Sequence, residues 1–397
     1  MRTLLLQLLF VCVAAAQSLD EFAQRVISQN PEIKSLEAEA KALEEEALIA
    51  GKLDNPMLGI QVTNIDFADP AKRNIEPMQQ IMYSLSQNIP LTSKLGAKEE
   101  AKKMGAKAAA HRLSQKKLDV EYSLKQSAYE LAKAKETKKI YEKYLQTLKF
   151  ALELSRASNV SGATNHNELI RGEMEVASFM RKINDLQAEE KSQARRIQSF
   201  GVKLEEELYI PFDMPSKDIQ NITAENSKEY ASAQMMAASA KSELRSEKLS
   251  LIPDIGITVG YASSDSKFRD YWFFGVTIPL PIYSKESASI RKKSHELSAK
   301  KDESENIKNN LSYELQNSKI RYETARKNYA LTNKILKTQL SHLLESALAA
   351  SKTSDSSKTY AISTIKDALS LELEMINYKY EANIALAQIK KLSGQEI

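Results

Sequence analysis

The sequence predicts a mainly α-helical protein with a transmembrane β part, built as two copies of one plan. Three observations support this fold class. Glycine and proline are scarce, with 11 and 10 in 397 residues, while alanine, leucine, glutamate and lysine are abundant, which is typical of long helices. Short stretches of alternating apolar residues interrupt the helical sequence. The same order of motifs also occurs twice along the chain.

The duplication is indicated by short motifs that recur in the same order at spacings between 189 and 197 residues. Pro56 precedes an alternating apolar stretch, as does Pro253, and the Ile-Pro-Leu motif at Pro90 recurs at Pro279. Each copy reads as a helix, two short strands and a long helical hairpin. The predicted organisation is a first repeat over 17–201, a linker over 202–224 and a second repeat over 225–397.

The first 16 residues have the pattern of an export signal. Arg2 gives a basic start, residues 4–13 are almost entirely apolar, and residues 14–16 are alanines that suit a signal peptidase. We therefore expect residues 1–16 to be removed. The alternative is a lipoprotein signal in which Cys12 is kept and lipidated, although a valine rather than a small residue precedes it.

Each repeat contains two stretches with the pattern of membrane-spanning β-strands. Apolar side chains alternate with small or polar ones over about ten residues, as in a strand with one face toward lipid and one toward a polar lumen. A soluble hairpin packed on a core is the alternative, but the flanking helices are too long to fold back over it. The predicted strands are 57–66, 80–89, 254–262 and 271–279.

Prolines close both strand pairs, at Pro90 in the first repeat and at Pro279 and Pro281 in the second. Proline lacks the amide hydrogen that a sheet ladder needs, so the sheet is expected to stop there. We therefore assign these prolines to the strand-to-helix junctions.

Two long helical hairpins are predicted, over residues 93–200 and 285–393. Their apolar residues follow heptad spacing, which favours coiled-coil packing. A first arm of some sixty residues would be roughly 90–100 Å long at 1.5 Å per residue, longer than a globular core requires. Polar, turn-forming stretches that include Gly162 and Ser354 interrupt the helices and are assigned as the hairpin tips.

No residue pattern indicates catalysis or cofactor binding. There is no nucleotide-binding loop, G-x-S-x-G motif or H-E-x-x-H motif, and the four histidines are far apart in the sequence. A net charge of +4 does not indicate nucleic-acid binding. The sequence therefore predicts a protein that is not an enzyme and has no cofactor, metal site or nucleic-acid partner.

The order of these motifs resembles that of the TolC-like outer-membrane factors. The similarity is carried by Gln87-Asn88-Ile89-Pro90-Leu91 with Lys94 and Gly96, by the Gly-Val-Thr-Ile-Pro-Leu-Pro-Ile-Tyr segment at 275–283, and by the segments 168–171 and 365–368 that follow the tips. Within this family, the heavy-metal branch of the cobalt–zinc–cadmium CzcC type is the most similar.

The resemblance implies a homotrimer in the Gram-negative outer membrane. Each chain would give four strands to a shared twelve-stranded β-barrel and its helices to a tunnel in the periplasm. This agrees with the rule that open sheet edges are not tolerated in lipid, because four strands cannot close a barrel alone. Such proteins are passive exit ducts of tripartite pumps. An inner-membrane RND-type transporter supplies the energy, and a periplasmic adaptor (membrane fusion) protein bridges it to the hairpin tips.

Three carboxylates near the predicted tips are candidates for a periplasmic gate or selectivity ring: Glu168, Asp355 and Asp367. In a trimer, each would form a three-fold charged ring that favours cations. A solvated surface or helix-capping role is the alternative for each. The tips themselves, marked by Gly162 and Ser354, are the expected adaptor contacts.

The leading functional prediction is an outer-membrane exit duct for divalent heavy-metal cations. One alternative keeps the duct but changes the cargo to drugs, other organic solutes or, in type I secretion, a protein. The other alternative is a non-pore coiled-coil structural protein of the periplasm, which the alternating strands argue against.

Overall fold

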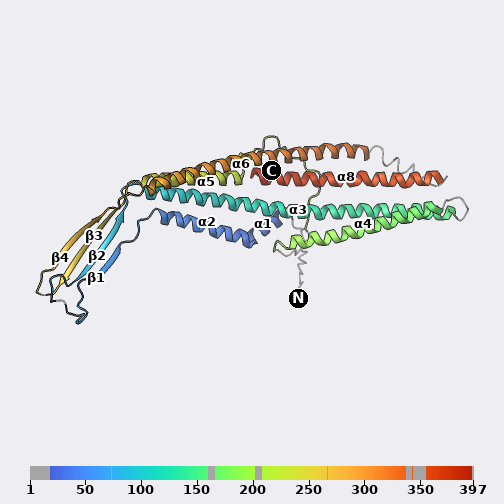
Figure 1. The fold of residues 1–397 in the computed structure, drawn as a ribbon. Helices are drawn as coiled ribbons and strands as arrows, with labels where there is room; N and C mark the ends of the chain where they lie inside the picture. The colour runs from blue at the N-terminus through green and yellow to red at the C-terminus, as the bar shows by residue number, and fades with distance from the viewer. Residues whose placement is uncertain are drawn as a thin grey trace, which may run out of the picture. The chain divides into compact units, whose positions relative to one another are not determined.

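The computed structural model describes residues 18–395, except 73, 160–165, 202–207, 266, 337–341 and 343–354. Over these residues the chain is mainly helical and contains one four-stranded sheet, which confirms the predicted fold class for the single chain (Figure 1). The predicted export signal, residues 1–16, lies outside the described residues.

The chain forms two compact units, each assembled from both sequence repeats. The sheet unit comprises Ser35–Leu113 and Lys228–Asn309, and the helical unit comprises Met1–Lys34, Ser114–Ser227 and Asn310–Ile397. Two long helices, α3 (Lys94–Asn159) and α6 (Lys285–Ile335), contribute residues to both units.

The sheet is antiparallel and its strands lie in sequence order, β1-β2-β3-β4 (Figure 1). The central pairing joins β2 of the first repeat to β3 of the second, so that the sheet is completed only by both copies. The strands are β1 (Met57–Val62), β2 (Gln80–Ile89), β3 (Ile255–Ser264) and β4 (Tyr271–Thr277). The helix α5 (Lys228–Leu249) precedes β3.

Two strands are shorter than the sequence predicts. Strand β1 ends at Val62 rather than at residue 66, because Asn64 adopts a positive φ of 50° and the Thr63 hydroxyl donates to the Met78 carbonyl at 2.6 Å. Strand β4 ends at Thr277, two residues before Pro279, which has no amide hydrogen for the ladder.

Two helices precede the first strand, α1 (Leu19–Gln29) and α2 (Pro31–Ala50), whereas the sequence predicts only the second, from Lys34 to Gly51. They are separated by Asn30, whose side-chain oxygen accepts a hydrogen bond from the Glu32 amide at 2.9 Å and thereby caps the second helix. Helix α1 begins with a capping box between Ser18 and Glu21, so both helices have a defined start.

The helical unit is built on the paired helices of the two hairpins. Helix α4 (His166–Gln198) lies along α3, to which it is joined by ion pairs between Lys138 and Glu190 at 2.8 Å and between Arg156 and Glu173 at 2.6 Å. Helix α8 (Asp355–Ser393) is the last long helix.

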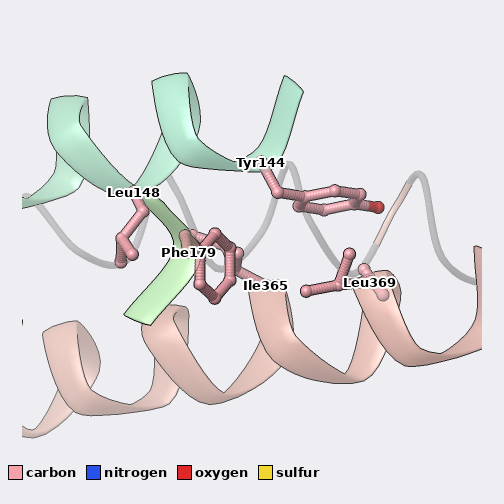
Figure 2. Packing of buried hydrophobic residues seen from close by; sticks show 6 residues of the cluster. Tyr144, Leu148, Phe179, Ile365 and Leu369 are labelled. Atoms are coloured by element: carbon pink, nitrogen blue, oxygen red, sulfur yellow. The ribbon is translucent and has the colours of Figure 1, made fainter. Parts of the chain in front are cut away.

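The interior of the helical unit is an apolar cluster supplied by three helices (Figure 2). Tyr144 and Leu148 come from α3, Phe179 from α4, and Ile365 and Leu369 from α8. All five side chains are buried. Residues from both repeats therefore share one core.

The described part of the predicted linker, residues 208–224, is held by side chains of the long helices. Lys319 of α6 donates to the carbonyls of Gln220 at 3.0 Å and Ile222 at 2.7 Å. The buried Tyr322 hydroxyl donates to the Pro215 carbonyl at 3.1 Å and accepts from the Lys217 amide at 2.9 Å. These side-chain hydrogen bonds satisfy backbone polar groups of the segment in place of the hydrogen bonds of a helix or sheet.

Candidate functional site

One face of the sheet is apolar across all four strands. The antiparallel register aligns Leu58, Leu85, Val259 and Phe274 in one row. Three of these side chains are largely exposed in the single chain: Leu58 at 73%, Leu85 at 53% and Phe274 at 78%. No charged residue occurs within the four strands. A continuous, exposed apolar surface of this kind marks an interaction site with protein or lipid.

The other face of the sheet carries mostly small and polar side chains, with two methionines and one phenylalanine among them. Ser86 and Thr258 lie across from each other with their hydroxyl oxygens 3.0 Å apart. Gln80 donates to the Tyr271 hydroxyl at 2.8 Å. The face is therefore polar but uncharged. An apolar face opposite a polar face is the pattern of a barrel strand between lipid and a lumen.

Aromatic side chains gather where the strands approach the β1–β2 and β3–β4 connections. Ile60, Tyr83, Tyr261 and Trp272 form one row of the apolar face. The rings of Tyr261 and Trp272 are in contact, with centroids 5.3 Å apart. Tyrosine and tryptophan at the end of an apolar band are typical of the boundary between lipid and water.

At the opposite end of the strands, the chain passes from sheet to helix through the predicted junctions. Pro90 follows the last residue of β2, and Pro279 and Pro281 lie between β4 and α6. Lys94, the first residue of α3, forms an ion pair with Asp254 at 2.6 Å, one residue before β3. This pair joins the two repeats at the end of the sheet.

The predicted tip and gate residues lie mostly outside the described residues. Gly162 and Ser354 are not among them, and the side chains of Glu168 and Asp355 are likewise outside the description. Asp367 is described, on α8, and its side chain is exposed. The gate ring therefore stays a prediction.

A hydrogen-bonded contact between hairpins was missed by sequence reasoning. Glu372 of α8 accepts from the Tyr144 hydroxyl at 3.0 Å and from Lys143 at 2.8 Å, both on α3. Burial raises the pKa of Tyr144, and the neighbouring carboxylate raises it further, so that the hydroxyl remains a donor. In the sequence, the four-residue spacing places Tyr144 and Leu148 on one helix face, but it does not identify Glu372 as the partner of Tyr144.

A second polar cluster of the helical unit holds helix α1. Lys125 of α3 contacts Asp20 at 2.9 Å and Glu121 at 2.8 Å, and Glu121 also pairs with Lys390 of α8 at 2.8 Å. Burial alone would lower the pKa of Lys125, but its hydrogen bonds to the two carboxylates raise it above its ordinary value. The hydrogen bond from Lys125 lowers the pKa of Asp20.

Among the described helices, none combines the length and apolar character needed to cross a membrane. The described part of the chain also contains no group of three or more histidine, cysteine, aspartate or glutamate residues placed to hold a metal ion.

Comparison with solved structures gives the same fold over nearly the whole chain. The outer-membrane channel OprN has 16% sequence identity and a TM-score of 0.77, with 95% of this chain and 90% of OprN covered. CusC, described for its transmembrane channel formation, has 14% identity and a TM-score of 0.79, with 95% and 92% covered. The Neisseria gonorrhoeae MtrE outer membrane channel has 13% identity and a TM-score of 0.79, with 95% and 88% covered.

Among curated protein sequences, none matches this chain significantly. The model of the family described as "Outer membrane efflux protein" matches residues 22–199. Because proteins of this family are transport ducts, the match confirms the prediction that the chain is not an enzyme. Residues 22–199 thus match the outer membrane efflux protein family, and the chain has the fold of the outer-membrane channels.

Proposed function

We propose that this protein is a trimeric exit duct in the outer membrane and serves a tripartite efflux pump. The observation that carries the proposal is the sheet: its four strands contain no charged residue, one face is apolar and exposed, and β1 and β4 have no further partner strand among the residues that the structure describes. Open edges are not tolerated in lipid, so neighbouring copies would have to supply the missing pairing. Three copies would give the twelve strands of one closed barrel.

A passive exit duct works together with partner proteins. The proposed arrangement has the strands in lipid and the helical hairpins in the periplasm, where an adaptor protein would contact the tips that include Gly162 and Ser354. An inner-membrane RND-type transporter would supply the energy. Support comes from the family match over residues 22–199 and from the similarity to CusC, OprN and MtrE.

For the cargo, we propose divalent heavy-metal cations, on the motif resemblance to the CzcC-type branch. The strands carry no charge, and we propose Glu168, Asp355 and Asp367 of the helices as the ring residues that favour cations. A matched test compares single-channel cation selectivity of the wild type with that of the triple variant Glu168→Gln, Asp355→Asn, Asp367→Asn. Unchanged selectivity would remove the gate assignment without affecting the duct.

The duct itself is tested by outer-membrane fractionation, followed by reconstitution of the purified protein into planar bilayers. We expect a heat-sensitive trimer in the outer membrane and discrete conductance steps. Protein that stays in the periplasm and conducts nothing would instead support the non-pore coiled-coil alternative.

The cargo is tested by growth of a deletion strain across zinc, cadmium, cobalt, nickel, copper and silver, beside dyes and detergents. Selective loss of metal tolerance, restored by the intact gene, is the expected result. Sensitivity to dyes with unchanged metal tolerance would keep the duct and assign it to organic cargo.

A further inference from the structure

The polar face of the sheet contains one hydrocarbon aromatic ring, that of Phe273. Its neighbours along β4, Trp272 and Phe274, project from the apolar face, because successive side chains of a strand point to opposite sides. Phe273 pairs with Gly260 of β3, which pairs in turn with Ser84 of β2. The ring therefore lies among the small side chains of the proposed lumen wall.

The Phe273 ring packs directly against Gly260, in the space that a side chain at residue 260 would fill. A Cβ atom at Gly260 would lie 2.1 Å from Phe273 Cζ and 2.5 Å from Phe273 Cε1, far inside contact distance. The ring can occupy this place only because residue 260 has no side chain. Gly275, on the same face of β4, differs: a Cβ there would meet nothing closer than 3.6 Å.

Apart from two methionines, the larger side chains of this wall other than Phe273 offer hydrogen-bonding groups rather than charge. The described strands contribute hydroxyls and amides such as Ser86, Thr258 and Gln80, and no ionised side chain. A hydrated metal ion gains little from an aromatic hydrocarbon surface. A solute with an apolar ring of its own gains an attractive contact with Phe273.

We propose that Phe273, seated on Gly260, is an apolar contact site in the barrel wall for organic cargo that carries ring-sized apolar surface. The site adds a second cargo class to the proposed metal export. It rests on the proposed duct, since only a closed barrel turns this face of the sheet into a lumen. In a trimer, three such rings would face one channel.

The test uses the reconstituted full-length trimer and two cations of equal charge, tetraphenylphosphonium and tetramethylammonium. Tetraphenylphosphonium is expected to interrupt the potassium current of the wild type with resolvable blocks, and tetramethylammonium is not. Phe273→Ala should shorten the tetraphenylphosphonium blocks by about two- to tenfold, the range expected for loss of one aromatic contact. If the alanine variant fails to assemble, the same measurement is made on Phe273→Leu, which removes the aromatic ring but keeps an apolar side chain of similar size.

Two matched controls separate the ring from general damage to the barrel. Phe274→Ala removes the neighbouring ring from the apolar face and should leave the block unchanged. Gly275→Ala adds a methyl group to the same face as Phe273, where its Cβ would meet nothing closer than 3.6 Å, and should also leave the block unchanged.

The outcomes distinguish this inference from the proposed function. A wild-type protein that forms no channel would overturn the duct. A channel without tetraphenylphosphonium block, or with blocks that Phe273→Ala and Phe274→Ala change equally, would overturn the contact site and leave the duct intact.

Discussion

The sheet unit and the helical unit distribute apolar and charged side chains in opposite ways. In the helical unit, Tyr144, Leu148 and Phe179 are buried together, and charged residues such as Lys138 and Glu190 pair outside this core. In the sheet, Leu58 and Phe274 are exposed and charge is absent from the strands. A protein surrounded only by water would follow the first pattern throughout. The contrast indicates that the apolar face of the sheet contacts an apolar environment rather than water.

The largest expected effect comes from the core of the helical unit. Leu148→Ala should lower the free energy of unfolding by about 2–5 kcal/mol, because it leaves a cavity among Tyr144, Phe179 and Ile365. The measurement is the midpoint of urea unfolding followed by circular dichroism. The matched control is Lys149→Ala, at the exposed next position, with an expected change within about 0.5 kcal/mol. Equal losses would show that this cluster does not support the hairpins.

Next in size is a charge on the apolar face of the sheet. Leu85→Arg should destabilise membrane insertion by about 2–4 kcal/mol if its position lies near the middle of the bilayer. Ser86→Arg, one residue along on the other face, should insert nearly as well as the wild type. The amount of heat-sensitive trimer in the outer membrane measures both. Equal tolerance of the two arginines would contradict a lipid-facing sheet.

A smaller effect is expected at the hydrogen bond between hairpins. Tyr144→Phe removes the donor to Glu372 and should lower the free energy of unfolding by about 1.5–3 kcal/mol, the range for a hydrogen bond to a charged group. Tyr141→Phe is the control, because the Tyr141 ring packs on Phe179 with centroids 5.4 Å apart and the substitution keeps that contact. Thermal unfolding compares the two variants. Equal shifts would assign the stabilisation to the rings rather than to the hydroxyl.

The smallest expected effect is a pH dependence at helix α1. Since Lys125 lowers the pKa of Asp20, the ionised carboxylate is favoured in the folded state. Its contribution is present above the ordinary aspartate pKa of about 4 and is lost as pH falls through that value and below it. Because Asp20 is largely exposed, less than about 1 kcal/mol is at stake. Asp20→Asn should flatten the acid-induced rise in proteolysis of α1, and Asp185→Asn should not.

The sequence predicted the fold class because each element has a local signal. Alternation from Leu58 to Val62 and uninterrupted helix formers after Lys94 are both properties of short windows. The apolar face was predictable in the same way, because Trp272, Phe274 and Val276 alternate with Phe273 and Gly275.

Contacts between distant segments could not be predicted in this way. The pairing of Tyr144 with Glu372, and the seat of Phe273 on Gly260, depend on which elements become neighbours. The end of β1 at Val62 depends on the hydrogen bond that the Thr63 hydroxyl donates to the Met78 carbonyl. None of these has a repeating pattern in the sequence. The cargo likewise has no local signal, since the strands are uncharged and carboxylates such as those of the predicted gate are typical of any solvated helix.

The pairing of β2 with β3 has a consequence for the order of folding. Gln80 lies opposite Ser264, so one edge of β2 stays unpaired until the second repeat has been synthesised and its strand β3 has reached β2. Contacts of such long sequence separation form slowly, because the intervening chain must first lose much of its freedom. Meanwhile the hairpin of α3 and α4, whose contacts are local, is free to form. We therefore expect this helical hairpin to form before β2 and β3 pair, which leaves the apolar strands exposed until the second repeat reaches them.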